Sequence, residues 1–426
     1  MLTDIKPAEW VHSTNIYEVN LRQYTAEGTF KAFATHLPRL KDMGVEVIWL
    51  MPITPISIKN RKGTLGSYYA CSSFVNTNPE FGSIDEFKQL VENIHSLGMK
   101  VIIDWVANHT GWDHEWTISH PDYYSQNSTG NFVPPVENWE DVIHLNFYNH
   151  NLRLAMIDAM KFWVEDCKID GFRCDMAMLV PADFWHQART FLDQIKKLFW
   201  LGEFDQWNEE IYAHVFDVSY TWHWMHKSEV FYQKEKRITE LDKALNNYQL
   251  KKPFQHIRSF FTSNHDENSW NGTEYEKYGK MAIPLAVFSC TWNGIPLIYS
   301  GQELPNTKRL QFFDKDEIKW TTNPELHQFY KTLLFLRKSH PALLAGHKEV
   351  ITWRIATDHP DQLFCFARKN KERELIVILN FSDEQINFSL RDLRIRGEFL
   401  NVINGDKQNG ADDFNIDPWG YIILSK

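Results

Sequence analysis

Apolar segments of strand length alternate with helix-like segments along the first 340 residues. One helix is expected at Asp85–Leu97, where apolar side chains recur with a helical period and Gly98 supplies the stop. Such alternation is typical of a parallel sheet. Eight strands are expected, at Asn15–Leu21, Val45–Leu50, Lys100–Val106, Gly171–Asp175, Phe199–Phe204, Val215–Tyr220, Arg258–Ser263 and Pro296–Ser300. The pattern predicts an α/β fold, a (β/α)8 TIM barrel with its active site at the carboxyl ends of the strands.

The pattern changes in two places. Residues 108–149 are rich in Trp, Asp, Asn, Pro and Gly without helical periodicity, which predicts a small loop-rich domain inserted after the third strand. Beyond residue 340, strands follow one another without helices, which predicts a C-terminal antiparallel β-sandwich. Its strands are expected at Val350–Arg354, Leu363–Arg368, Leu375–Asn380, Glu398–Val402 and Tyr421–Leu424. The expected domains are a barrel over 1–107 and 150–340, the insert over 108–149 and the sandwich over 341–426.

Composition narrows the possible partners. The net charge of −10 and the lack of a basic run argue against a nucleic-acid partner, and the longest apolar stretches are shorter than the roughly 18 residues of a membrane span. The amino terminus has neither a basic start nor an apolar segment of signal-peptide length. We therefore expect a cytoplasmic protein, or a periplasmic or secreted one if a signal peptide has been removed. Five scattered cysteines predict reduced, buried thiols rather than disulfides.

Polar and charged side chains lie at the carboxyl ends of four of the expected strands. Such side chains would be unfavourable there if these positions were only part of an apolar core. They are Asp104, Asn108 and His109 after the third strand, Arg173 and Asp175 on the fourth, Glu203 on the fifth, and Asn264, His265 and Asp266 after the seventh. A single such group is as readily explained by an ion pair or a loop cap. Four groups at matching strand ends favour a catalytic site on one rim of the barrel.

Two carboxylates of this set suggest glycosidase chemistry. Arg173 and Asp175 share a face of their strand, so the guanidinium keeps Asp175 ionised and directed, as a nucleophile requires. Glu203 ends what should be the neighbouring strand, which places the two carboxyl groups near the separation of about 5 Å that suits a retaining glycosidase. We expect Asp175 to attack the anomeric carbon. Glu203, protonated at the start, would protonate the leaving oxygen and then activate water.

Four segments together resemble the sequence motifs of the alpha-amylase family, glycoside hydrolase family 13. They are Asp104-Trp-Val-Ala-Asn108-His109, Gly171-Phe-Arg173-Cys-Asp175, Gly202-Glu203-Phe204 and Phe261-Thr-Ser-Asn264-His265-Asp266. Their order and spacing agree with the family. The resemblance extends to Gly66-Ser-Tyr-Tyr69 and to Asn78-Pro-Glu-Phe-Gly82, whereas the C-terminal part resembles the family only by position and strandedness.

The resemblance implies a role for each site residue. Asp175 matches the nucleophile, Glu203 the acid/base and Asp266 the third carboxylate, which binds sugar hydroxyls. The residues that match groups around the sugar ring are Arg173, His109 and His265, with Tyr69 as the aromatic that stacks on it and Tyr68 as the adjacent alternative. Asp104 is expected to be structural.

Two departures bear on partners and cofactors. Many family amylases carry Lys-His shortly after the nucleophile, where this chain has Met178 and Leu179, so recognition on the leaving-group side must differ. Asn108 matches a ligand of structural calcium in many members, with the remaining ligands expected from the insert. The chemistry itself requires no cofactor, and a structural calcium remains possible.

The expected activity is hydrolysis of alpha-glucans, with alpha-1,4-linked starch or maltooligosaccharides as substrates. A glucan transglycosylase or an alpha-glucosidase of the same family is the first alternative. A metal-dependent hydrolase is disfavoured because Arg173 beside Asp175 would repel a cation. A non-catalytic sugar-binding scaffold is disfavoured because all three carboxylates are present.

Overall fold

The computed structural model describes residues 6–205, 209–235, 237–250 and 256–426. Within these residues, eight parallel strands close into a barrel in the order β1-β10-β9-β8-β7-β6-β3-β2, which confirms the predicted TIM barrel. Each expected strand overlaps an observed one. The barrel strands are β1 (Ile16–Val19), β2 (Val47–Leu50), β3 (Lys100–Trp105), β6 (Gly171–Cys174), β7 (Phe199–Gly202), β8 (Val218–Ser219), β9 (Ile257–Phe260) and β10 (Ile295–Tyr299).

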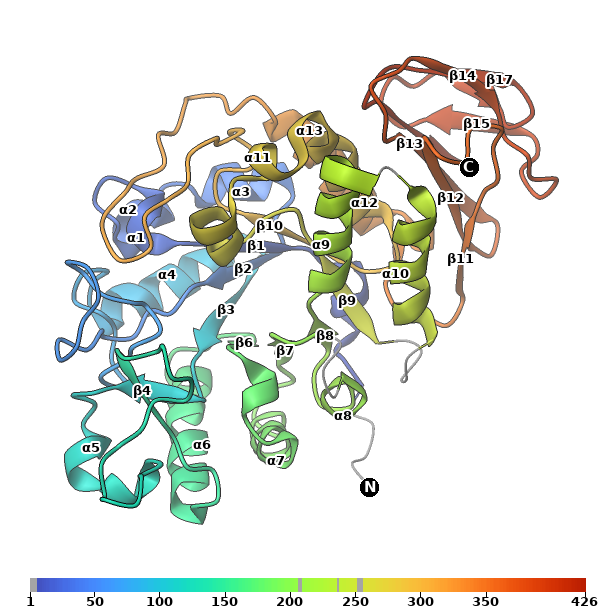
Figure 1. The fold of residues 1–426 in the computed structure, drawn as a ribbon. Coiled ribbons are helices and arrows are strands. Elements are labelled where there is room, and N and C mark those ends of the chain that lie inside the picture. Colours follow the sequence, from blue (N-terminus) through green and yellow to red (C-terminus); the bar gives the residue numbers. More distant parts are fainter. Residues whose placement is uncertain (1–5, 206–208, 236, 251–255) are drawn as a thin grey trace. The chain divides into compact units, whose positions relative to one another are not determined.

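Helices separate the barrel strands along the chain. The α-helices are α1 (Leu21–Tyr24), α2 (Phe30–Ala34), α3 (Leu37–Met43), α4 (Ile84–Ser96), α5 (Trp116–Ser119), α6 (His150–Glu165), α7 (Ala182–Leu192), α8 (Glu209–Ala213), α9 (Trp222–Val230), α10 (Ile238–Leu250), α11 (Glu274–Tyr278), α12 (Ala282–Thr291) and α13 (His327–Ser339). Helices α4, α6 and α7 lie outside strands β2, β3, β6 and β7 (Figure 1). Strands covered in this way are buried on both faces, which explains the apolar run of β2.

Short 3-10 and π segments complete the helical elements. The 3-10 segments are η1 (Glu9–Ser13), η2 (Pro121–Tyr123), η3 (Ala177–Leu179), η6 (Gly279–Met281) and η7 (Pro341–Leu343), and the π segments are η4 (Phe231–Glu235) and η5 (Glu267–Asn271). The π segment η5 begins directly after Asp266, and single π turns occur frequently at functional sites.

Helix α4 shows how the local sequence defines an element. The Ser83 hydroxyl accepts a hydrogen bond from the Glu86 N–H at 3.2 Å, and the Glu86 carboxylate accepts one from the Ser83 N–H at 2.8 Å. This capping box satisfies two backbone donors at the helix start. The apolar face that the sequence predicted is buried, through Phe87, Leu90, Val91 and Ile94.

The segment between β3 and α6 contains more regular structure than its composition indicated. Strands β4 (His109–Gly111) and β5 (Val142–His144) pair antiparallel, and the short helix α5 lies between them in the sequence. Because these elements have only three or four residues each, no periodicity could reveal them. The first residue of β4, His109, is also a candidate site residue.

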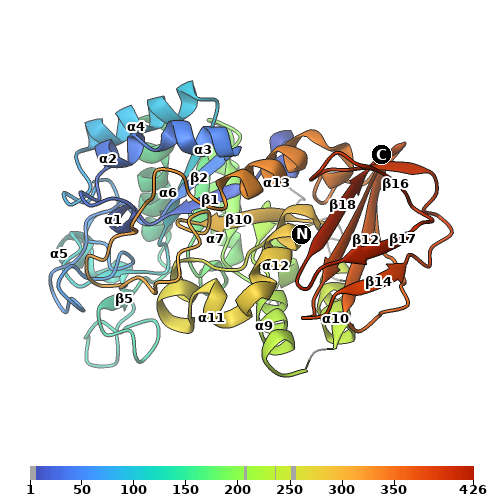
Figure 2. The same cartoon turned by 90° about the horizontal axis from the view of Figure 1, so that it is seen from above.

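The C-terminal strands form antiparallel sheets, as expected. One sheet has the order β11-β12-β13-β18-β15-β16, and β14 pairs with β17. The strands are β11 (Val350–Arg354), β12 (Leu363–Asn370), β13 (Arg373–Asn380), β14 (Ile386–Ser389), β15 (Glu398–Asn401), β16 (Lys407–Asn409), β17 (Asp413–Ile416) and β18 (Tyr421–Ser425). Figure 2 shows β14 and β17 beside one another. Ile376 and Ile378 of one sheet and Phe388 and Phe414 of the other belong to one buried cluster.

The chain divides into two compact units, and their division passes through the barrel. Ile16–Ser219 and Tyr299–Pro324 belong to the first unit, and Tyr220–Ile298 and Glu325–Lys426 belong to the second. The domain limits expected from the sequence therefore remain a prediction. The five cysteines are free and buried, as predicted.

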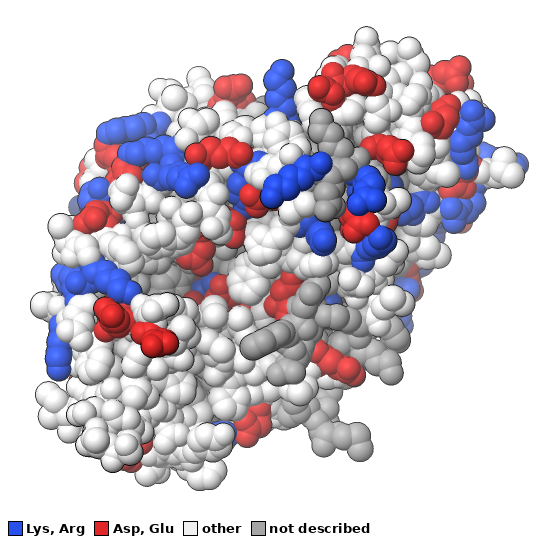
Figure 3. Space-filling view, viewed as in Figure 1, with Lys and Arg blue, Asp and Glu red and all other residues white. Residues whose placement is uncertain are grey.

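The surface carries charges of both signs. On the face drawn in Figure 3, basic and acidic side chains are interspersed between larger uncharged areas. Within the described residues, no helix combines the length and the apolar character needed to cross a bilayer. The expected cytoplasmic location stays a prediction.

Candidate active site

Strand register brings four of the predicted polar residues together in the first unit. In the parallel pair β3 and β6, Asp104 lies opposite Arg173, and in the pair β6 and β7, Cys174 lies opposite Gly202. Asp175 and Glu203 are the next residues of β6 and β7, so they follow adjacent strands at the same level. The expected neighbourhood of these two strands is thereby confirmed.

The Arg173 guanidinium contacts three carboxylates. Its Nη1 donates to Asp104 Oδ1 at 2.9 Å and to Asp175 Oδ1 at 3.0 Å, and its Nη2 lies 2.7 Å from Glu203 Oε2. The arginine side chain is fully buried. Sequence reasoning paired Arg173 with Asp175 alone. The contact with Glu203 was missed, because it depends on the rotamers of two side chains on different strands.

Asp104 connects this cluster to the loop after β2. Its Oδ2 accepts hydrogen bonds from Trp49 Nε1 at 3.2 Å and from the Tyr69 hydroxyl at 3.1 Å. The Arg173 guanidinium also lies over the Trp49 ring, 4.9 Å from its centroid. Asp104 is thus held by three donors, as suits the structural role expected of it.

The two adjacent tyrosines occupy different environments. Tyr69 is half-buried and reaches the carboxylate cluster, whereas Tyr68 is fully buried and donates to Asn20 Oδ1 at 2.9 Å. Phe312, from the segment after β10, is stacked on Tyr69 with a centroid distance of 6.3 Å. The sequence offered no sign of this aromatic pair, because Phe312 is far along the chain and lies in no motif.

A left-handed residue follows Asp175. Met176 has φ 40° and ψ 45°, a conformation that non-glycine residues adopt rarely and that tends to occur at functional sites. This turn directs the Met176 N–H to Glu203 Oε2 at 2.7 Å. Oε2 therefore accepts the Met176 N–H and lies 2.7 Å from Arg173 Nη2, while Oε1 accepts no hydrogen bond from the described part of the chain.

His109 is buried beside the insert. Its Nδ1 lies 3.2 Å from Asn108 Nδ2, and its ring meets Trp139 edge to face at 5.6 Å. Burial, and after it the nearby His144, lowers the pKa of His109 to about 3. The imidazole is therefore neutral near pH 7 and can form hydrogen bonds without carrying a charge.

Asn108 is the one calcium ligand that the resemblance implies. Its Nδ2 lies 3.2 Å from His109 Nδ1, a contact that does not involve its side-chain oxygen. The described residues contain no group of three His, Cys, Asp or Glu side chains that could hold a metal ion. Calcium also takes amide and backbone carbonyl oxygens as ligands, so a structural calcium stays a prediction.

His265 and Asp266 lie in the second unit, after β9. His265 Nε2 is 3.3 Å from Asp266 Oδ2; the histidine is buried, and the side chain of Asp266 is 43% exposed. Asn264 Oδ1 accepts the Glu267 N–H at 2.8 Å, which closes the turn around them. Glu267 in turn pairs with the buried Lys277 at 2.5 Å. Asp266 is thus a partly open carboxylate on a braced turn.

Two family models match most of the chain. The model of the alpha amylase catalytic domain matches residues 6–142 and 136–323, and that of the alpha amylase C-terminal all-beta domain matches 353–423. The chain belongs to the alpha-amylase family of glycoside hydrolases. The resemblance seen in the four motifs is thereby confirmed.

Individual relatives of this family cover nearly the whole chain. Alpha-amylase MalA of Haloarcula japonica is 27% identical over 96% of the chain, which spans 62% of that relative's length. A cyclomaltodextrinase of Thermoanaerobacter pseudethanolicus is 24% identical over 88% of the chain and 67% of its own length. Among solved structures, the noncanonic maltogenic alpha-amylase AmyB of Thermotoga neapolitana has a TM-score of 0.88 and 28% identity, covering 98% of this chain and 99% of its own.

The departure from the family pattern after Asp175 has a structural counterpart. The Met178 and Val180 carbonyls both accept hydrogen bonds from the Tyr212 hydroxyl, at 3.1 and 3.0 Å. Tyr212 thereby fixes the backbone of the segment where other members carry Lys-His. This alpha-amylase family member presents Met178 and Leu179 there, neither of which can form an ion pair or donate a side-chain hydrogen bond.

Proposed function

We propose that this chain is a retaining glycoside hydrolase that cleaves alpha-glucans, with alpha-1,4-linked starch or maltooligosaccharides as substrates. Asp175 is the nucleophile, Glu203 the acid/base and Asp266 the carboxylate that binds sugar hydroxyls. The observation that carries the proposal is the register of β6 and β7, which supports a close approach of Asp175 and Glu203. Adjacent strands lie about 4.8 Å apart, near the spacing of retaining rather than inverting carboxylate pairs.

The reaction proceeds in two displacements. Asp175 attacks the anomeric carbon while the bond to the leaving oxygen breaks, and Glu203 gives its proton to that oxygen. Glu203 then takes a proton from water, and the water oxygen displaces Asp175 from the anomeric carbon. The starting configuration is restored, and every proton is moved by Glu203 or water.

The remaining candidates bind the sugar. Tyr69 stacks on the sugar ring in the cleavage subsite. His109, Arg173 and His265 are the groups that lie around this ring. Because His109 is neutral and buried, it contributes directed hydrogen bonds without adding charge. Arg173 acts chiefly through the carboxylates that it orients.

A substrate panel tests the proposal. Starch, maltooligosaccharides, cyclodextrin, pullulan, dextran and sucrose are incubated with the enzyme, and product sizes and anomers are followed by chromatography and proton NMR. Hydrolysis of alpha-1,4 chains with retention at the new reducing end is expected. An inverted product contradicts the two-step mechanism, and cleavage restricted to dextran or to the alpha-1,6 bonds of pullulan contradicts the alpha-1,4 preference.

Isosteric variants test whether the activity depends on the proposed site residues. Glu203→Gln should lower kcat by about 10²–10⁴-fold, the usual worth of an acid/base group. Asp175→Asn should abolish formation of the covalent intermediate. Glu92→Gln, on the exposed face of α4, is the matched control and should leave kcat unchanged.

Transfer to sugar hydroxyls is the second candidate outcome, because the missing Lys-His pair leaves the choice between hydrolysis and transfer open. Without those polar groups, the leaving-group side of this chain offers a different surface to an incoming acceptor. If a single maltooligosaccharide gives longer products as well as shorter ones, the enzyme is a transglycosylase. Products that are only shorter identify a hydrolase.

A further inference from the structure

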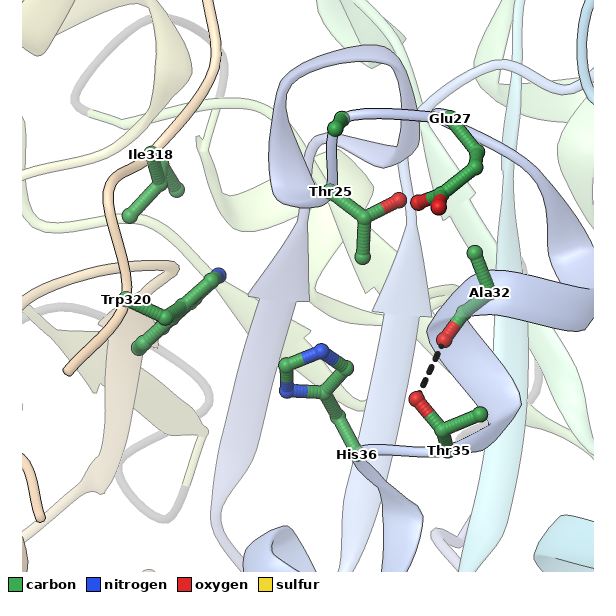
Figure 4. A pocket seen from close by; sticks show the side chains of 8 residues that line it. Thr25, Glu27, Ala32, Thr35, His36, Ile318 and Trp320 are labelled. Atoms are coloured by element: carbon green, nitrogen blue, oxygen red, sulfur yellow. Dashed lines mark hydrogen bonds between the residues drawn. The ribbon is translucent and has the colours of Figure 1, made fainter. Parts of the chain in front are cut away.

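A second pocket lies in the first unit, on segments that carry none of the candidate active-site residues. It has a volume of about 310 Å³, at the lower end of the range for small-molecule sites. Its lining comes from two parts of the chain, residues Thr25, Ala26, Glu27, Ala32, Thr35 and His36 on one side and Ile318 and Trp320 on the other. Figure 4 shows the two groups facing each other across the opening.

One wall of this pocket is apolar and rigid. Trp320 Nε1 donates to the Tyr24 carbonyl at 2.7 Å, and the Arg39 guanidinium lies 4.5 Å from the centre of the indole ring. The Ile318 N–H donates to the Gln23 carbonyl at 2.8 Å. A wall held in this way loses little freedom when a ligand binds, which favours affinity.

The opposite wall is polar and retains hydrogen-bonding capacity. The side chains of Glu27 and His36 form no hydrogen bond with the described residues. The Thr25 hydroxyl oxygen accepts from the Gly28 N–H at 2.9 Å, so its proton can still be donated. The Thr35 hydroxyl donates to the Ala32 carbonyl at 2.8 Å, so its oxygen can still accept. This wall thus offers both hydrogen-bond donors and acceptors.

The charges of the lining narrow the ligand class. A single carboxylate, Glu27, disfavours phosphate and other anions, and it supplies too few oxygens for a divalent cation. Burial, and after it the charge of Arg39, lowers the pKa of His36 from its ordinary value, so the ring is neutral at pH 7. A neutral ligand with many hydroxyl groups and an apolar face matches both walls. A pyranose ring has this character.

We infer that this pocket is a second, non-catalytic binding site for one or two glucosyl units of an alpha-glucan. The identity of the sugar rests on the proposed function, whereas the existence of a polyhydroxyl site rests on the lining alone. Phe312, which stacks on Tyr69, belongs to the same segment as Ile318 and Trp320. A glucan held in the pocket would therefore keep the substrate polymer close to the catalytic residues.

Binding is tested in the Glu203→Gln background, so that turnover does not interfere. Migration in native gels with increasing soluble starch gives the dissociation constant. Ala32→Leu fills the pocket and should weaken starch binding by about ten-fold or more through steric exclusion. Glu27→Gln replaces the charged acceptor by a neutral one and should weaken binding by about ten-fold, as expected for the loss of a charge-assisted hydrogen bond. Lys31→Ala, at an exposed position of α2, is the control and should migrate like the parent. Unchanged migration of both pocket variants overturns the inference.

A second measurement separates this site from catalysis. With Glu203 restored, the pocket variants should hydrolyse starch granules more slowly and a short maltooligosaccharide at the rate of the parent. An equal loss on both substrates overturns the inference, because the pocket would then act through the catalytic residues. If the parent cleaves no glucan but the pocket variants still lose starch binding, the proposed function fails and the binding site stands.

Discussion

Arg173 contacts both Glu203 and Asp175, with its Nη2 2.7 Å from Glu203 Oε2 and its Nη1 3.0 Å from Asp175 Oδ1. One rigid planar cation thus sets the positions of both carboxylates that the proposed mechanism uses. A guanidinium can do this because its nitrogens point in fixed directions, whereas an ammonium is a point charge.

Arg173→Lys should therefore lower kcat/KM by about 10²-fold or more, since a small displacement of reacting groups has effects of that size. Because lysine keeps the positive charge, a loss of kcat/KM would reflect the changed positions of the carboxylates rather than a missing charge. Rates on a maltooligosaccharide and the melting temperature are measured together. Arg153→Lys is the control, because its partner Asp183 is on the surface. If Arg173→Lys retains more than about half of the activity, the positioning role of Arg173 is wrong.

The left-handed backbone conformation of Met176 leads to a prediction about backbone strain. Its positive φ suits glycine and opposes β-branched residues, while its N–H to Glu203 is kept by either substitution. Met176→Gly should keep activity within a few-fold, and Met176→Val should lose most of it. The ratio of the two kcat values is the measurement. Equal values for the two variants would show that the left-handed turn is unimportant.

The sequence predicted the barrel and the matching positions of Asp175 and Glu203 at the ends of adjacent strands, because both follow from repeating patterns. Asp175 and Glu203 each follow an apolar strand, and one strand-helix-strand unit separates them. The turn at Met176 could not be predicted, since methionine gives no signal for a positive φ. Nor could the stacking of Phe312 on Tyr69, which depends on where two distant loops meet.

The C-terminal strands illustrate the same limit. Expected strands such as Leu375–Asn380 are long and apolar, whereas β14, β16 and β17 were missed because they are short and rich in Asn, Asp and Ser. Residues of that kind are typical of turns. Only the packing of Phe388 and Phe414 into the common core makes β14 and β17 stable.

Phe312 is predicted to influence substrate binding through Tyr69. Phe312→Leu keeps an apolar side chain but removes the ring that limits the tilt of Tyr69, so KM for a maltooligosaccharide should rise several-fold with a smaller change in kcat. Phe335→Leu, at an exposed position of α13, is the control. A fall in kcat at constant KM would instead indicate that Phe312 acts on the chemical step.

The buried pair of Lys277 and Glu267 is predicted to stabilise the turn that carries Asp266. Both side chains are almost fully buried, so Lys277→Met should lower the free energy of unfolding by about 3–5 kcal/mol, because an unpaired buried carboxylate remains. Adding Glu267→Gln should recover most of the loss, as measured by urea unfolding. Lys280→Met, at an exposed position nearby, is the control. A double variant as unstable as the single one would exclude charge burial as the cause.

His109 is predicted to make the protein sensitive to acid. Its pKa is about 3 in the folded chain and about 6.5 when exposed, so the unfolded chain binds the proton more readily between these values. The contribution of neutral His109 to the free energy of unfolding is fully present above pH 6.5. It falls as the pH drops toward 3, by up to about 1.4 kcal/mol per pH unit. His109→Asn should flatten this dependence in urea unfolding between pH 4 and 7, whereas His150→Asn, whose ring is exposed, should not. Parallel curves for the parent and His109→Asn would mean that His109 is charged in the folded chain, and a hydrogen-bonding role as a neutral ring would then be untenable.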